Sequence, residues 1–167
     1  RLLYMDDMFF ACGNLKKIKF SKFFNLEKVK MMNHAFQSCA KLEEINLTFN
    51  NNTTHDIKFM FDTCSFLKKI ELAFKGDITS FENLFAYCKS LEEVNLTSVN
   101  TSYIFNCKKM FLFCTSLKKV NLSTFTGQRV YDVSSMFNNC ISLKEINLSS
   151  CNTGTKVKMN DMFSKGP

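Results

Sequence analysis

The eight cysteines are the residues of this chain with the widest range of chemistry, and six of them recur at regular intervals. A cysteine can form a disulfide, hold a metal ion or act as a nucleophile, and as a protonated thiol it can fill a small apolar position in a core. The recurring six are Cys12, Cys39, Cys64, Cys88, Cys114 and Cys140. Their nearly constant spacing indicates an internal repeat, so their chemistry depends on the elements that position them.

Each repeat contains two different apolar patterns. Apolar residues stand seven, four and three positions before each cysteine, as Val133, Met136 and Phe137 do before Cys140. This spacing predicts one face of a short helix or 3₁₀ turn. After the cysteine, the order L-x-x-[IV]-x-L has a period of two and predicts a short strand. In four repeats the helical pattern follows a residue suited to capping a helix, namely Asp56, Ser80, Asn106 or Asp132.

One turn and one parallel strand in each repeat predict an α/β solenoid, a leucine-rich-repeat array of about six units of roughly 24–27 residues each. One unit cannot bury its own apolar face, whereas stacked units share a continuous core. The chain has one proline and five glycines, so no linker is expected and residues 1–167 are predicted to form a single domain. Both ends fall inside a repeat, so we expect a longer native array or end-to-end packing.

In such an array each recurring cysteine takes the last inward position of its turn. A zinc site is not expected, because the chain has no C-x-x-C motif and only two histidines, His34 and His55. Disulfides along the stack would need a geometry that parallel inward-pointing thiols disfavour. We interpret the cysteines as core residues, with paired or reactive thiols as the alternative. Cys107 is expected to be buried with them, and Cys151, in a loop, to be the exposed thiol.

Outward residues of successive strands would form polar ladders on the concave face. Lysine and glutamate alternate along the first ladder, and opposite charges on neighbouring strands stabilise a sheet by about 0.2–1 kcal/mol per pair. Asparagine dominates the second and opens N-L-[ST] sequons, which we interpret as polar strand residues because glycans on adjacent strands would crowd each other. This face is the candidate binding surface. Its residues are Lys17, Lys19, Glu44, Asn46, Lys69, Glu71, Glu93, Asn95, Lys119, Asn121, Glu145 and Asn147.

Several function classes find no support in the sequence. The net charge of +7 lies mostly toward the two ends, but a strand face of alternating charge is no basic groove, so nucleic acid is not expected as a partner. No phosphate-binding loop, nucleophile elbow or dinucleotide motif occurs, so we expect neither an enzyme nor a cofactor. No apolar run reaches the roughly 18 residues of a transmembrane helix.

Nineteen phenylalanines recur mostly at core positions of the repeat. A phenylalanine outside that pattern is a candidate for a contact surface, because exposed apolar side chains often mark one. The candidates are Phe10, Phe24, Phe66 and Phe113.

The motif M-F-x-x-C-x-S-L-K-x-[IV]-N-L-S, as in Met136–Ser149, resembles the BspA-like leucine-rich repeat, which is also common in mycoplasma-type surface lipoproteins. The resemblance covers essentially the whole chain, although Ala35 and Leu84 replace the usual Met. It implies a cell-surface or extracellular protein that adheres to host matrix or cell-surface proteins. The alternative is an intracellular scaffold or structural subunit. The cysteine spacing is also similar to repeats of F-box ubiquitin-ligase adaptors, but their second cysteine is matched only by Cys151.

Overall fold

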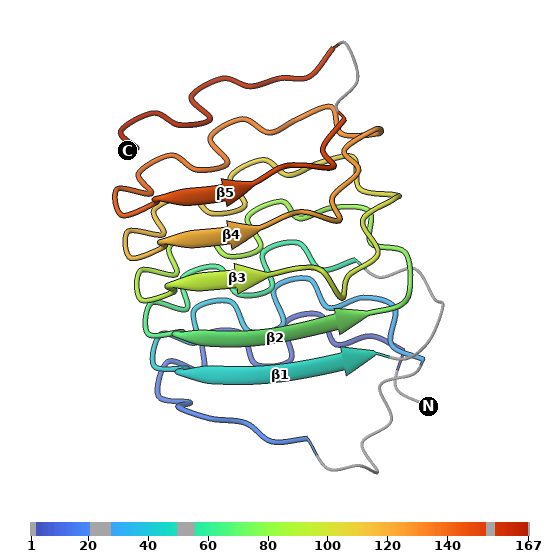
Figure 1. Cartoon of the computed structure of the whole chain (residues 1–167). Helices are drawn as coiled ribbons and strands as arrows, with labels where there is room; N and C mark the ends of the chain where they lie inside the picture. Colours follow the sequence, from blue (N-terminus) through green and yellow to red (C-terminus); the bar gives the residue numbers. More distant parts are fainter. Residues whose placement is uncertain (1–2, 21–27, 50–55, 153–155, 167) are drawn as a thin grey trace.

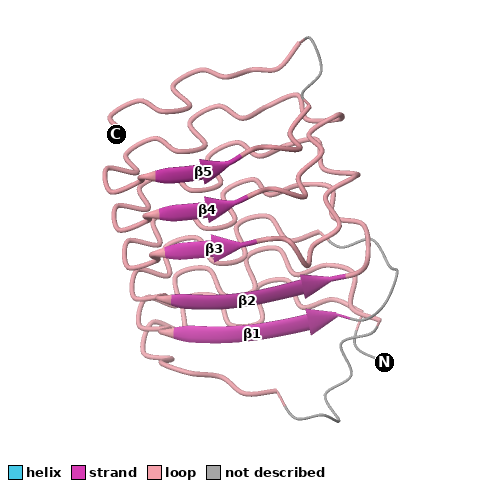
Figure 2. Cartoon of the chain, in the orientation of Figure 1, coloured by secondary structure: helices cyan, strands magenta, loops and turns pink. Residues whose placement is uncertain are grey.

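The computed structural model describes residues 3–20, 28–49, 56–152 and 156–166. Its repeats stack one above another, and five strands lie side by side (Figure 1; Figure 2). β1 and β2 span Glu44–Phe49 and Lys69–Phe74, and β3, β4 and β5 span Glu93–Asn95, Lys119–Asn121 and Glu145–Asn147. These strands pair in parallel, as the leucine-rich-repeat prediction requires.

The strands pair at the positions that their alternating charges predict. Glu44 lies opposite Lys69, and Lys119 lies between Glu93 and Glu145. The residue that follows each charge points inward; Val120, for example, is fully buried. A slip of one residue would expose these apolar side chains, so burial and charge pairing select the same register.

The sheet is interrupted between β2 and β3. β1 and β2 form one pair, and β3, β4 and β5 form a separate sheet. In the predicted register Lys69 aligns with Glu93, so that Phe74, at the end of β2, would align with Ser98. Phe74 instead pairs with Val99, one position further along the chain. Over this span the repeat that contains β3 therefore has one residue more than the repeat that contains β2. This difference prevents a continuous ladder of strand hydrogen bonds.

Consecutive β-turns occupy the segments where short helices were predicted, and the described part of the chain contains no helix. The N–H groups of Leu84, Ala86 and Cys88 donate to carbonyls three residues back, at N···O distances of 3.1–3.2 Å. The N–H groups between them, on Phe85 and Tyr87, donate to carbonyls of the next repeat at 2.9 and 2.7 Å. The turns therefore form a second hydrogen-bonded ladder between repeats.

The helix prediction was wrong because the apolar pattern has a period of four residues. Two successive four-residue turns place apolar residues at i, i+3, i+4 and i+7, and over so short a segment a helical face has the same pattern. The third residue of each turn has a φ of 52–63°, as in a type II turn and unlike a helix. Several of these positions hold residues such as Phe59, Tyr87 and Lys109, which give no sequence signal for a positive φ.

Glycine at one of these positions is expected to stabilise the chain. Lys109 has a φ of 57°, where a side chain costs about 1–2 kcal/mol and glycine has no such penalty. After allowance for the greater freedom of glycine in the unfolded chain, Lys109→Gly should raise the free energy of unfolding by about 0.5–1 kcal/mol. Urea denaturation measures the change. Lys108→Gly, one residue earlier and without a positive φ, is the control and should lower the free energy of unfolding. Equal effects of the two substitutions would contradict the turn geometry.

The core is continuous from repeat to repeat. One phenylalanine of each repeat stacks on the next, with ring centroids 5.1–5.8 Å apart. The stacked residues are Phe9, Phe36, Phe61, Phe85, Phe111, Phe137 and Phe163. Each repeat thus buries its apolar side chains mainly against its two neighbours, which holds the strand face in place.

Candidate functional site

Five of the six recurring cysteines lie in the core, as predicted, and these five make the same hydrogen bond; the sixth, Cys12, is exposed. All eight cysteines are free thiols, and six are buried: Cys39, Cys64, Cys88, Cys107, Cys114 and Cys140. In five of these six the Sγ–H donates to the carbonyl of a phenylalanine in the preceding repeat at 3.1–3.2 Å, as Cys88 does to Phe61. A small apolar residue with a weak donor suits this position, because the carbonyl it meets is buried.

Burial makes these thiols poor nucleophiles. It raises the pKa of Cys39 to about 11 and that of Cys140 to about 12, and it holds the pKa of Cys88 and Cys114 well above the usual range. Because the thiolate is the reactive form, buried thiols that stay protonated are chemically inert at neutral pH.

The prediction that Cys151 is the exposed thiol was wrong. Cys151 is half-buried, packs against the core and has a pKa raised by burial. Cys12 is the exposed cysteine.

Alkylation of the native protein should follow this order of exposure. Iodoacetamide at neutral pH is expected to label Cys12 first and Cys151 more slowly, and to leave the six buried thiols unlabelled until the chain unfolds. Mass spectrometry of proteolytic peptides measures the labelling at each position. Native labelling of Cys88 or Cys114 at the rate of Cys12 would contradict the packing described here.

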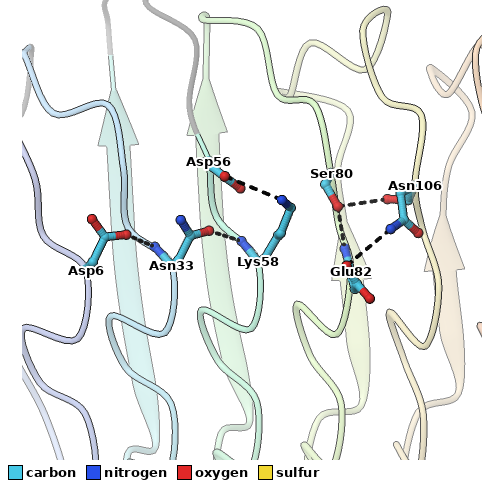
Figure 3. A network of polar contacts seen from close by, with 7 residues as sticks. All are labelled: Asp6, Asn33, Asp56, Lys58, Ser80, Glu82 and Asn106. Carbon is cyan, nitrogen blue, oxygen red and sulfur yellow. Dashed lines mark hydrogen bonds and ion pairs between the residues drawn. The ribbon is translucent and has the colours of Figure 1, made fainter.

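A column of polar residues borders the turns (Figure 3). The side-chain oxygens of Ser80, Asn106 and Asp132 accept the N–H two residues further on at 2.8–3.1 Å, as a helix cap would. Three of the four predicted capping residues therefore make the capping contact, although turns follow them instead of helices. In addition, Asn106 Nδ2 donates to Glu82 Oε2 at 3.2 Å.

Asp56 departs from this pattern. The N–H of Lys58 donates to Asn33 Oδ1 of the preceding repeat at 2.9 Å, and Lys58 Nζ lies 3.6 Å from Asp56 Oδ2 (Figure 3). The other carboxylate oxygen of Asp56 is buried and, within the described residues, has no hydrogen-bond partner. The column joins successive repeats and gives a structural account of these polar residues.

The environment of His34 is that of a packed side chain. The ring of His34 stacks on Phe59 with centroids 4.9 Å apart, and its Nδ1 lies 2.6 Å from Gln37 Oε1. His55 lies outside the described residues. Within the described ranges, no three His, Cys, Asp or Glu side chains come together as metal ligands would. That same part of the chain holds no helix with the length and apolar character needed to cross a bilayer.

The interruption of the sheet divides the candidate strand face into two groups of residues. The first lies on β1 and β2 and the segment before them, and comprises Lys17, Lys19, Glu44, Asn46, Lys69 and Glu71. The second lies on β3, β4 and β5, and comprises Glu93, Asn95, Lys119, Asn121, Glu145 and Asn147.

Ion pairs neutralise part of this face. Lys17 pairs with Glu44, and Lys119 Nζ lies 3.1 Å from Glu145 Oε1. Beside them Lys118 Nζ lies 2.6 Å from Glu92 Oε2, and its hydrogen bond lowers the pKa of Glu92. All these side chains are substantially exposed, so the pairs add little stability and mainly cancel charge.

Three of the four asparagines of the second ladder end their strands. Oδ1 of Asn95, Asn121 and Asn147 accepts the N–H of the Ser or Thr two residues on, at 3.0–3.1 Å. Asparagine is favoured there because its side chain replaces the next strand hydrogen bond with a local turn. This contact gives a structural reason for the N-L-[ST] sequence at these three positions.

An open groove of about 600 Å³ lies where the sheet is interrupted. Lys69, Glu71 and Glu93 line it, with Ile70 and Val94 among its apolar residues. Lys69 and Glu93 occupy neighbouring ladder positions, yet among the described residues no ion pair joins them. The groove is therefore a part of the strand face where charged groups remain available to a ligand.

An aromatic patch lies away from the strands, and the sequence analysis missed it. Two segments one repeat apart, 103–105 and 129–131, run together through the hydrogen bond from Tyr131 N–H to the Phe105 carbonyl, at 2.9 Å. Tyr103, Phe105, Arg129 and Tyr131 are exposed on these segments, and the residues between them are buried. The sequence carried one signal for this patch. The segment Y-I-F alternates with a period of two, and R-V-Y does so at the equivalent place in the next repeat.

The contact candidates among the phenylalanines have different environments. Phe10 and Phe66 are exposed, with 51% and 55% of their surface accessible. Phe113 is half-buried and stacks on Tyr87 with centroids 5.1 Å apart. Phe24 lies outside the described residues.

Comparisons with known proteins match this repeat. A family model described as the BspA type leucine rich repeat region (6 copies) matches residues 4–107. A second, described as a Mycoplasma protein of unknown function (DUF285), matches residues 65–167. The sequence matches none of the curated proteins with which it was compared.

One solved structure is similar to the chain. It is a leucine rich cell surface protein from Faecalibacterium prausnitzii A2-165, with 26% sequence identity and a TM-score of 0.55. The match covers 72% of this chain but 30% of that protein, so this chain corresponds to less than a third of its relative's length.

Proposed function

Because the chain belongs to the BspA-type leucine-rich repeat family, we propose that it is a non-enzymatic, protein-binding module of a cell-surface protein and acts in adhesion to host matrix or to other cells. The surface location is supported by the similarity to a solved cell-surface protein. Binding is supported by the groove at the interrupted sheet, where Lys69, Glu71 and Glu93 lie beside apolar side chains and form no ion pair with any described residue. Proteins generally bind through such surfaces of mixed polar and apolar character.

We also propose that the repeats form one domain of a longer array. The two family matches overlap over residues 65–107, which favours a single domain over two. The solved relative is longer than this chain, and repeats of this kind are stabilised by neighbours stacked at both ends.

Adhesion can be tested with beads that carry the purified chain and are applied to matrix deposited by cultured epithelial cells. A groove variant, Lys69→Ala with Glu93→Ala, should lose most of the adhesion. The matched control, Lys17→Ala with Glu44→Ala, removes an equal number of charges that already pair with each other, and should keep it.

No adhesion by the unmodified chain would overturn the adhesive role. Equal loss in both variants would overturn the groove as the site of adhesion. Melting temperatures of both variants must match that of the unmodified chain for this comparison.

A further inference from the structure

We propose that the patch formed by Tyr103, Phe105, Arg129 and Tyr131 is a second binding surface, and that it recognises an acidic polypeptide segment with apolar or aromatic side chains beside its carboxylates. This inference rests on the proposed role in protein binding. It locates a contact on segments 103–105 and 129–131, outside the strands.

The aromatic part of the patch is exposed but held in a fixed arrangement. Tyr103, Phe105 and Tyr131 keep 43%, 36% and 44% of their surface accessible. The rings of Phe105 and Tyr131 stack with centroids 5.9 Å apart. Buried Ile104 and Val130 anchor the two segments to the core. A ligand would therefore gain apolar contacts without having to order these side chains, and ordering is a main cost of binding.

Arg129 gives the patch its charge preference. Its guanidinium lies over the ring of Tyr103, 4.9 Å from the centroid. Among the described residues no carboxylate forms an ion pair with it. A guanidinium that is held over a ring and lacks an anionic partner can donate to both oxygens of a carboxylate.

The composition of the patch favours a polypeptide as the ligand. Tyr and Arg are enriched among the residues that dominate protein–protein binding. Residues 100–167 carry nine Lys and Arg against three acids, so the surrounding repeats also attract an acidic partner.

Short synthetic peptides test this directly. Fluorescence anisotropy should detect binding of a peptide in which Glu alternates with Tyr, at least about tenfold tighter than one in which Glu alternates with Ser. Arg129→Ala and Tyr131→Ala should each weaken it about tenfold, whereas Tyr131→Phe, which keeps the ring, should retain it. Lys118→Ala on the strand face removes a positive charge outside the patch and is the control.

The proposal would be overturned by no measurable binding, by equal binding of the two peptides, or by equal effects of Arg129→Ala and Lys118→Ala. Patch-dependent binding of polygalacturonate that exceeds binding of the Glu-Tyr peptide would overturn it too, and would make this an acidic-sugar site. If the groove variant alone loses bead adhesion and the peptide does not bind, this inference is overturned and the proposed function stands.

If the peptide binds through the patch but the beads do not adhere to matrix, the proposed adhesive function is overturned and this inference stands.

Discussion

Raising the pH from about 8 to about 10 is expected to unfold the chain, because six buried thiols cannot ionise inside the core. An unfolded cysteine has a pKa near 8.5, so the unfolded chain loses these protons above about pH 9. In the folded chain burial raises the pKa of Cys39 to about 11 and that of Cys140 to about 12, and it keeps Cys88 and Cys114 well above the usual range.

The direction of this pH dependence is set by the number of protons that each state binds. Above the unfolded pKa the folded state binds more protons than the unfolded state, so the free energy of unfolding falls as the pH rises. Each thiol contributes about 1.4 kcal/mol per pH unit. By about pH 10 the six buried thiols together lower the free energy of unfolding by on the order of 10 kcal/mol, which is comparable with the whole stability of a domain.

Urea denaturation at several pH values, with a non-thiol reductant present, measures the slope. Cys114→Ala should be less stable at neutral pH, because it leaves a small cavity, yet its stability should fall with pH less steeply by about 1.4 kcal/mol per unit. Cys12→Ala, at the exposed position, should leave the slope unchanged. A stability that stays constant between about pH 8 and 10 would show that the thiols are not buried in the native chain.

Removal of one ring from the phenylalanine stack is expected to have the largest effect of any single substitution proposed here. Phe85 is fully buried and stacks on Phe61 and Phe111, with centroids 5.8 and 5.6 Å away. Phe85→Ala should lower the free energy of unfolding by about 3–5 kcal/mol, because neighbouring repeats cannot close the cavity without breaking their own hydrogen bonds.

Phe66→Ala is the matched control. Phe66 is 55% exposed, so its loss should change the stability by no more than about 0.5 kcal/mol. Urea denaturation of both variants measures the difference. Equal effects of the two substitutions would mean that the stack does not form the core.

The sequence predicted the strands better than the turns. On the strands, burial has a period of two and the charges alternate between Lys119 and its neighbours Glu93 and Glu145, so two independent patterns select one register. On the turns, a four-residue period resembles a helix over so few residues, and the positive φ falls on residues as ordinary as Phe59 and Lys109. Hydrogen bonds between repeats favour the turns over a helix, and they join residues far apart in the sequence.

The candidate surfaces depended even more on contacts between repeats. The groove lies where the sheet is interrupted between β2 and β3, and that interruption appears only when the repeats are stacked. The aromatic patch likewise needs Arg129 to lie over Tyr103 of the preceding repeat. The sequence identified the polar ladder of the strand face, but it could not identify which charges pair and which remain free.

Protease treatment of intact source cells tests most directly the claim that this is a cell-surface binding module. Peptides from the repeats should be released before lysis and identified by mass spectrometry, while a cytoplasmic marker stays inside. Repeat peptides that appear only after lysis, with the membrane intact until then, would contradict a surface role and favour an intracellular scaffold.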